Sequence, residues 1–173
     1  DAIGVLTEET TEDMQKMAAM EANTEPYLKT SVWKHARHRI VWLLVLMLSA
    51  SITGAIISKY EAAFAAVPLL VSFIPMLMDT GGNCGSQSST LIIRGLAVDE
   101  LHFADAAKVI WKELRVALLV GLGLGIVNAG SIMLRYNDPR LAVVVSLSLL
   151  CTVMCAKVTG GLLPIAAKRL GLD

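Results

Sequence analysis

Three oxygen-bearing side chains at a regular spacing are the first candidates for chemistry in this sequence. Asp79, Asn83 and Gln87 follow one another at intervals of four residues, so on an α-helix they form one continuous stripe. A carboxylate and two amides, with no thiolate or imidazole among them, suit a hard cation such as Mg²⁺ or Ca²⁺. The spacing therefore predicts a site or a path for a divalent cation.

The residues between these three fit the same interpretation. Thr80 and Ser86 add hydroxyl oxygens beside the stripe, and Gly82 lets a hydrated ion or another backbone approach closely. Mg²⁺ gives up its water molecules reluctantly, so we expect the side-chain oxygens to bind the waters of a largely hydrated ion. The residue types thus leave Mg²⁺ and Ca²⁺ as candidate ligands of this segment.

The same residues admit two other interpretations. Lys157 is the other charge within the long apolar segments, so it could pair with Asp79 and join two helices, with or without an ion path. Asp79-Thr80-Gly81 also has the sequence of the Asp-Thr-Gly triplet of aspartic proteases. That chemistry needs two carboxylates that share a proton, and no second acid lies in those segments. We therefore expect no enzyme.

The elements that must position the stripe follow from the distribution of charge. Of 173 residues, 55% are apolar and 17% are charged, whereas a soluble domain has about 25% charged residues. The formal net charge is zero, which disfavours a nucleic-acid partner. Four segments, 40–57, 62–93, 116–134 and 141–167, are nearly free of charge. Each is near or above the roughly 20 residues that cross a bilayer as a helix. The prediction is an all-α, multi-pass transmembrane bundle.

The sequence makes a prediction about local geometry in two segments. The segment 62–93 would extend on the order of 48 Å as one helix, longer than a bilayer core. We expect it to tilt, to protrude or to break, with Pro68, Pro75 and Gly81-Gly82 as the candidate points. The segment 98–111 alternates apolar and charged residues in a way that predicts an amphipathic helix at the membrane interface.

Residues 1–36 form a different region from the membrane domain predicted for 37–173. Lys and Arg residues gather before residue 40 and between 94 and 115, so we expect a plasma-membrane protein whose N-terminus is cytoplasmic. Glu9, Glu12 and Asp13 share one face of a predicted helix, where they repel one another unless a cation bridges them. A solvated, acidic helix start is the alternative interpretation.

Several segments together resemble one known family. Residues 75–97, with the core Gly-Gly-Asn-Cys-Gly-Ser-Gln, resemble the signature of the MgtE family of magnesium channels. Residues 8–14 are similar to the start of that family's connecting (plug) helix, residues 39–44 to its first span, and residues 161–173 to the end of its fourth. The resemblance covers essentially the whole chain. It implies a homodimer in the lipid bilayer, with one Mg²⁺ pore on the two-fold axis lined by the second and fifth spans.

The resemblance also implies that the channel is regulated by Mg²⁺, and this chain departs from the pattern of the family at several points. Glu9, Glu12, Asp13 and Asp173 match positions that bind cytosolic Mg²⁺ and hold the channel closed. The family has sensor domains before this region and a fifth span after it, with the principal acidic pore residue, so we expect this chain to be part of a longer protein. Asp79 stands where many members carry a non-acidic residue. The alternatives are a broader divalent-cation transporter (Mn²⁺, Co²⁺), an ion-coupled transporter, or a non-transporting membrane assembly fragment that lacks the last pore helix.

Overall fold

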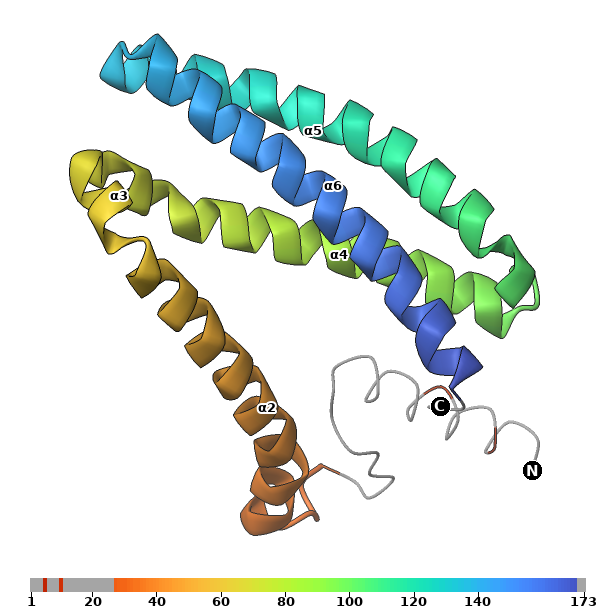
Figure 1. Cartoon of the computed structure of the whole chain (residues 1–173). Helices are drawn as coiled ribbons and strands as arrows, with labels where there is room; N and C mark the ends of the chain where they lie inside the picture. Colours follow the sequence, from red (N-terminus) through yellow and green to blue (C-terminus); the bar gives the residue numbers. More distant parts are fainter. Residues whose placement is uncertain (1–4, 6–9, 11–26, 171–173) are drawn as a thin grey trace. The chain divides into compact units, whose positions relative to one another are not determined.

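The computed structural model describes residues 5, 10 and 27–170, and within them every regular element is a helix. The elements are α2 (Val32–Lys59), α3 (Glu61–Ala66), η1 (Pro68–Phe73), α4 (Ile74–Ala97), η2 (Phe103–Asp105), α5 (Ala106–Tyr136) and α6 (Pro139–Arg169) (Figure 1). The all-α prediction is confirmed for this part of the chain. Glu9, Glu12, Asp13 and Asp173 lie outside the described residues, as does the body of the expected connecting helix.

The chain divides into two compact units, residues 1–63 and 64–173, which are described separately. The boundary at residues 36 and 37 stays a prediction. In the first unit, the Ser31 side chain caps α2 by accepting a hydrogen bond from the backbone N–H of Lys34 at 3.3 Å. α2 contains the segment 40–57 and has no buried residue, as expected for an apolar helix that is not covered by its own unit.

The long segment 62–93 is not one helix. α3 ends at Ala66, Val67 leaves the helical conformation, and Pro68 begins the 3₁₀ helix η1 that leads into α4. Proline has no N–H to donate and its ring crowds the preceding turn, which explains the break at Pro68. Pro75 lies in the first turn of α4, where no N–H is required. Gly81 and Gly82 continue the helix.

The prediction of a separate helix over residues 98–111 is wrong. The chain turns after α4 with Asp99 in a left-handed conformation (φ 53°), passes through η2 and enters α5 at Ala106. The Gly95 carbonyl accepts hydrogen bonds from the N–H groups of Glu100 and Leu101 and closes this turn. Instead of the amphipathic helix that the pattern suggested, the segment forms a turn in which Leu101 and Ala106 pack against a buried cluster.

A short polar cluster supports the start of α5. Asp105 accepts a hydrogen bond from Lys108 Nζ at 2.8 Å and another from the backbone N–H of His102 at 3.2 Å. These hydrogen bonds, with the positive charge of Lys108, hold the pKa of the Asp105 carboxyl below its usual range. The charged form of Asp105 therefore helps to hold the turn between α4 and α5.

α5 and α6 form an antiparallel hairpin. Asn137 adopts the left-handed conformation that ends α5, and the Asp138 side chain caps α6 by accepting from the N–H groups of Arg140 and Leu141. The predicted segments 116–134 and 141–167 lie inside these two helices, which both continue beyond them. Pro164 is accommodated within α6.

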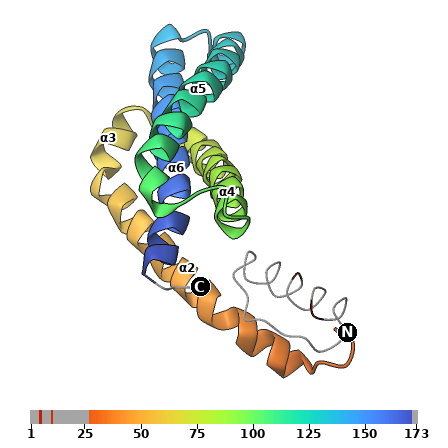
Figure 2. The ribbon, with the colours of Figure 1, turned by 90° about the vertical axis from the view of Figure 1, so that its right-hand side faces the viewer.

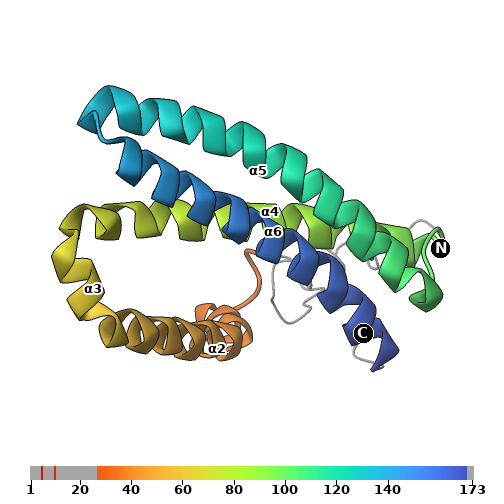
Figure 3. The same ribbon diagram turned by 45° about the horizontal axis from the view of Figure 1, so that its top comes forward.

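α6 is the helix around which the second unit is built, because it packs against both α4 and α5 (Figures 1 and 3). Figure 2 shows the same pairings from the side. Each buried cluster contains residues of α6: one joins Val153 to Cys84 of α4 and Ala117 of α5, and a second joins Ile165 to Ile92 and Val109. The buried face of α4 is thus fixed by α6.

Three of the described helices, α2, α5 and α6, are long and apolar enough to cross a membrane by length and composition. α4 is not among them, and it is the helix that carries Asp79 with its row of amide and hydroxyl groups. The predicted number of four spans therefore stays a prediction that depends on how the polar side of α4 is covered.

Candidate ion-binding face

α4 has two chemically different faces. One face is exposed and polar, and its members are Asp79, Gly82, Asn83, Ser86, Gln87 and Thr90. The opposite face is buried and contains Cys84, Ser88, Ile92 and Leu96. The structure thus brings five of the predicted ion-path residues together on one side of the helix, hereafter the polar face. Thr80 is half-buried and lies at its edge.

Within the polar face, Asp79 and Asn83 contact each other directly. Asn83 Nδ2 donates a hydrogen bond to Asp79 Oδ2 at 3.2 Å, which is the i to i+4 contact expected on one helix face. No Lys, Arg or His forms an ion pair with Asp79 in the part of the chain that the structure describes. The carboxylate therefore remains the source of negative charge on this face.

The sequence suggested that Lys157 pairs with Asp79, but the structure gives Lys157 other partners. Its Nζ atom lies 3.9 Å from Oε2 of Glu113 on α5 and donates a hydrogen bond to Ser88 Oγ at 3.2 Å. Ser88 Oγ in turn donates to Glu113 Oε2 at 2.6 Å. All three residues are at least nine-tenths buried. This buried network joins α4, α5 and α6 on the side of α4 that faces away from Asp79.

Glu113 and Ser88 are the residues that sequence reasoning missed. Glu113 precedes the predicted start of the third span at residue 116, so it does not count among the intramembrane charges of the sequence pattern. A signal was nevertheless present in the sequence, because the small residues Ala117, Gly121 and Gly125 follow Glu113 at intervals of four. All four are buried in α5. This periodicity places Glu113 on the packed side of the helix.

Glycines allow the backbones of α4 and α6 to touch. A Cβ atom on Gly160 would overlap the carbonyl oxygen of Gly85, and a Cβ atom on Gly81 would lie 2.9 Å from Cγ2 of Thr152. Gly85 itself packs against the Ala156 carbonyl. This close approach places Lys157 within reach of Ser88, and it holds the polar face on the outer side of the pair.

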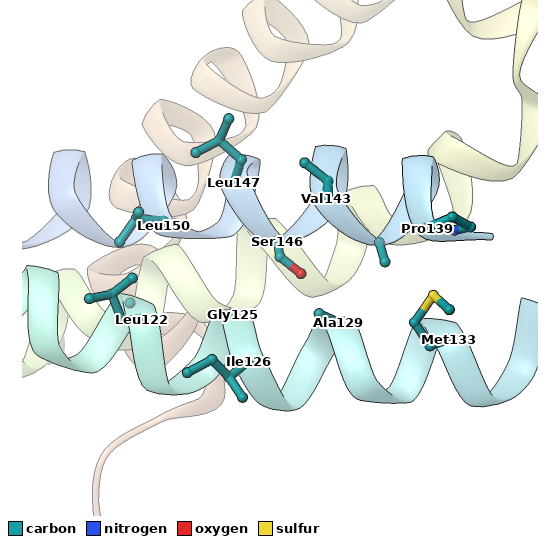
Figure 4. Close-up of a pocket in the computed structure, with 12 residues that line it drawn as sticks. Leu122, Gly125, Ile126, Ala129, Met133, Pro139, Val143, Ser146, Leu147 and Leu150 are labelled. Atoms are coloured by element: carbon teal, nitrogen blue, oxygen red, sulfur yellow. The ribbon is translucent and has the colours of Figure 1, made fainter. Parts of the chain in front are cut away.

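Other features offer weaker candidates for an ion site. Within residues 5, 10 and 27–170, no three His, Cys, Asp or Glu side chains converge on a common point. A groove of about 460 Å³ lies between α5 and α6. Its lining is almost entirely apolar and includes Leu122, Ile126 and Leu147 (Figure 4). Ser146 is its one hydroxyl, and it accepts a hydrogen bond from Asn128. A groove without charge does not suit a cation.

Comparison with known proteins bears on the same helix. Residues 74–173, which begin at the first residue of α4, match the family model MgtE, described as a divalent cation transporter. Over the whole chain, the sequence is 38% identical to a protein named magnesium transporter MgtE from Thermus thermophilus. The identity is 31% to the protein of that name from Bacillus subtilis and 29% to that from Enterococcus faecalis. The chain spans 38% of the length of each of these relatives.

Proposed function

The chain belongs to the MgtE family of divalent cation transporters, and from that premise we propose that it takes part in conducting Mg²⁺ across the plasma membrane into the cytoplasm. The ion would pass along the polar face of α4. The observation that carries this proposal is the exposure of Asp79, Asn83 and Gln87 on one side of a helix whose other side is buried. A carboxylate kept within an apolar chain is costly unless it serves an ion or a partner.

The chemistry of the face favours an ion that keeps part of its water. One carboxylate, two amides and the Ser86 hydroxyl offer hydrogen-bond acceptors along about two turns of helix. Mg²⁺ demands near-octahedral geometry and usually keeps several of its water molecules. The acceptors of the polar face can bind these waters without replacing them. A partly hydrated Mg²⁺ would therefore be attracted by Asp79 and guided past Asn83 and Gln87.

A second copy of the chain would complete the path. The polar face is open in one copy, and an open polar face is poorly solvated by lipid. If two copies of α4 face each other across a two-fold axis, their polar sides enclose a shared aqueous space with two Asp79 carboxylates. This homodimer would also let α4 serve as the second of four spans, with the N-terminus in the cytoplasm.

The expected regulation concerns residues outside the described part of the chain. Glu9, Glu12 and Asp13 would bind cytosolic Mg²⁺ together with Asp173. The bridging ion would remove the mutual repulsion of these carboxylates and favour the closed state. Mg²⁺ would thus act as substrate and as regulator.

Removing the charge or the amide of the polar face should slow transport without preventing assembly. For Asp79→Asn and Asn83→Ala we expect Mg²⁺ influx into liposomes to fall about tenfold, because a local negative charge and its oriented partner raise the local cation concentration by this order. Asp99→Asn is the matched control. It removes an exposed carboxylate from a left-handed turn position that Asn tolerates well. Unchanged influx in both Asp79→Asn and Asn83→Ala would contradict the proposed path.

Selectivity separates the leading proposal from its alternative, a broader divalent transporter. The matched family is described by divalent cations in general, and oxygen ligands accept Mn²⁺ as well as Mg²⁺. For a Mg²⁺-selective path we expect Mg²⁺ binding measured by calorimetry to be competed only weakly by Mn²⁺, Co²⁺ and Ca²⁺. Strong competition by Mn²⁺ and Co²⁺ would favour the broader transporter. A protein with its natural flanking sequence that shows no ion flux would instead favour the assembly role.

A further inference from the structure

A row of basic and aromatic side chains on α5 has no part in the proposed ion path, which follows α4. Its members are all exposed and lie within about two turns on one side of the helix, hereafter the basic row: Lys108, Trp111, Lys112 and Arg115. We propose that the basic row binds the headgroup of an anionic phospholipid, and that one acyl chain of this lipid enters the apolar groove between α5 and α6. The proposal goes beyond ion transport and does not depend on it.

The basic row keeps a positive charge that a count along the sequence would cancel. Lys108 is paired with Asp105, whose Oδ1 atom lies 2.8 Å from the lysine Nζ. Glu113 follows Lys112 directly in the chain, but its carboxylate is buried and its ion-pair partner lies on α6. Within the part of the chain that the structure describes, Lys112 and Arg115 form no ion pair. Their charges therefore remain available to an anion from outside the chain.

The indole of Trp111 favours a lipid headgroup over a free anion as the ligand. The Arg115 guanidinium lies over the Trp111 ring, 5.7 Å from its centroid, and the attraction between them holds the charge beside the indole. Tryptophan prefers the boundary between hydrocarbon and headgroups. Directly after Arg115, residues 116–134 carry no charge. The basic row thus lies at the end of an apolar helix segment, which is the level of the lipid phosphates.

The groove begins on the same side of α5 as the basic row. One stripe along the helix joins Arg115 to Leu122 and Ile126, which both line the groove (Figure 4). Leu122 lies about 10 Å beyond Arg115 along the helix, and exposed apolar side chains such as Leu118 and Leu119 cover that distance. The hydrocarbon of one leaflet is about 15 Å thick. An acyl chain whose headgroup is at the basic row therefore reaches the groove with its terminal part.

The first experiment tests the charge of the basic row. The protein with all of its natural sequence is purified in neutral detergent and titrated with phosphatidylglycerol or with phosphatidylcholine of the same acyl chains. Native mass spectrometry measures the affinity for the first lipid bound. Lys112→Gln with Arg115→Gln removes the two available charges. Arg135→Gln with Arg140→Gln is the matched control, because it removes two exposed charges at the turn between α5 and α6. Both double variants should melt like the parent in neutral lipid, since the side chains are exposed.

We expect the parent and the control to prefer phosphatidylglycerol. The variant without Lys112 and Arg115 should bind this lipid about thirtyfold more weakly, which is the effect of two basic side chains at a headgroup. No preference in the parent, or an equal loss in both double variants, would overturn the proposal. Displacement of the lipid by inorganic phosphate would assign the basic row to free anions and would overturn it as well.

The second experiment locates the acyl chain. Phosphatidylglycerol with a photoreactive group at the end of one chain is bound and irradiated, and the labelled peptides are identified. We expect labels at the near end of the groove, at residues 121–126 and 146–150, with phosphatidylcholine and the basic-row variant giving weaker labelling there. Equal labelling by both lipids would refute the place of the chain. Neither readout depends on ion flux, so a protein that transports no Mg²⁺ would refute the proposed function and leave this test intact.

Discussion

Gly160→Ala is expected to separate α4 from α6 and to lower stability more than alanine at any other glycine of the described residues. The new Cβ atom would overlap the carbonyl oxygen of Gly85 and would lie 2.9 Å from its Cα atom. Both are backbone atoms of a packed helix, so no side chain can rotate away to make room. Overpacking of a core costs about 1–3 kcal/mol, and we expect a value at the upper end of that range.

Thermal unfolding of the purified protein in lipid nanodiscs measures this effect as a lowered Tm. Gly130→Ala is the matched control, because a Cβ atom at Gly130 of α5 meets no atom within 4 Å. Alanine is favoured over glycine in a helix by about 1 kcal/mol, so the Tm of the control should stay constant or rise slightly. If Gly160→Ala melted at the same temperature as Gly130→Ala, the backbone contact between α4 and α6 would be wrong.

Lys157→Met is expected to destabilise the protein by about 3–5 kcal/mol, which is the usual cost of leaving one member of a buried ion pair without its partner. Methionine has a similar length and keeps the apolar part of the lysine side chain. The loss therefore comes from Glu113, whose buried carboxylate would retain only the hydrogen bond from Ser88. A lowered Tm with reduced yield of folded protein is the expected observation.

A second substitution at the partner distinguishes this cause from a loss of packing. Glu113→Leu combined with Lys157→Met removes both charges, and we expect it to recover most of the lost Tm, since apolar replacements of buried pairs are often neutral or stabilising. Lys112→Met, which removes an exposed lysine one position before Glu113, should leave the Tm unchanged. A double variant that melts no higher than Lys157→Met would show that the lysine stabilises the protein in another way.

The sequence determined the relations among residues within each helix. Asp79, Asn83 and Gln87 lie on one exposed face because the helical repeat places every fourth residue on the same side. α3 ends two residues before Pro68, because this proline lacks an N–H group and its ring crowds the preceding turn. Asp138 caps α6 through hydrogen bonds to the next residues along the chain. Each of these features depends on neighbours within a few positions, which the sequence alone specifies.

The tertiary structure decided which faces meet. Lys157 and Asp79 were natural partners when charges were counted along the chain, yet Lys157 lies between Ser88 and Glu113. The difference arises because the crossing of α4 and α6 is set by the contact of Gly85 with Gly160, and two glycines can meet only where both backbones are bare. That contact turns Ser88 inward and Asp79 outward. Periodicity fixes the angle between two residues on one helix, whereas the partner opposite each residue depends on the packing of three helices at once.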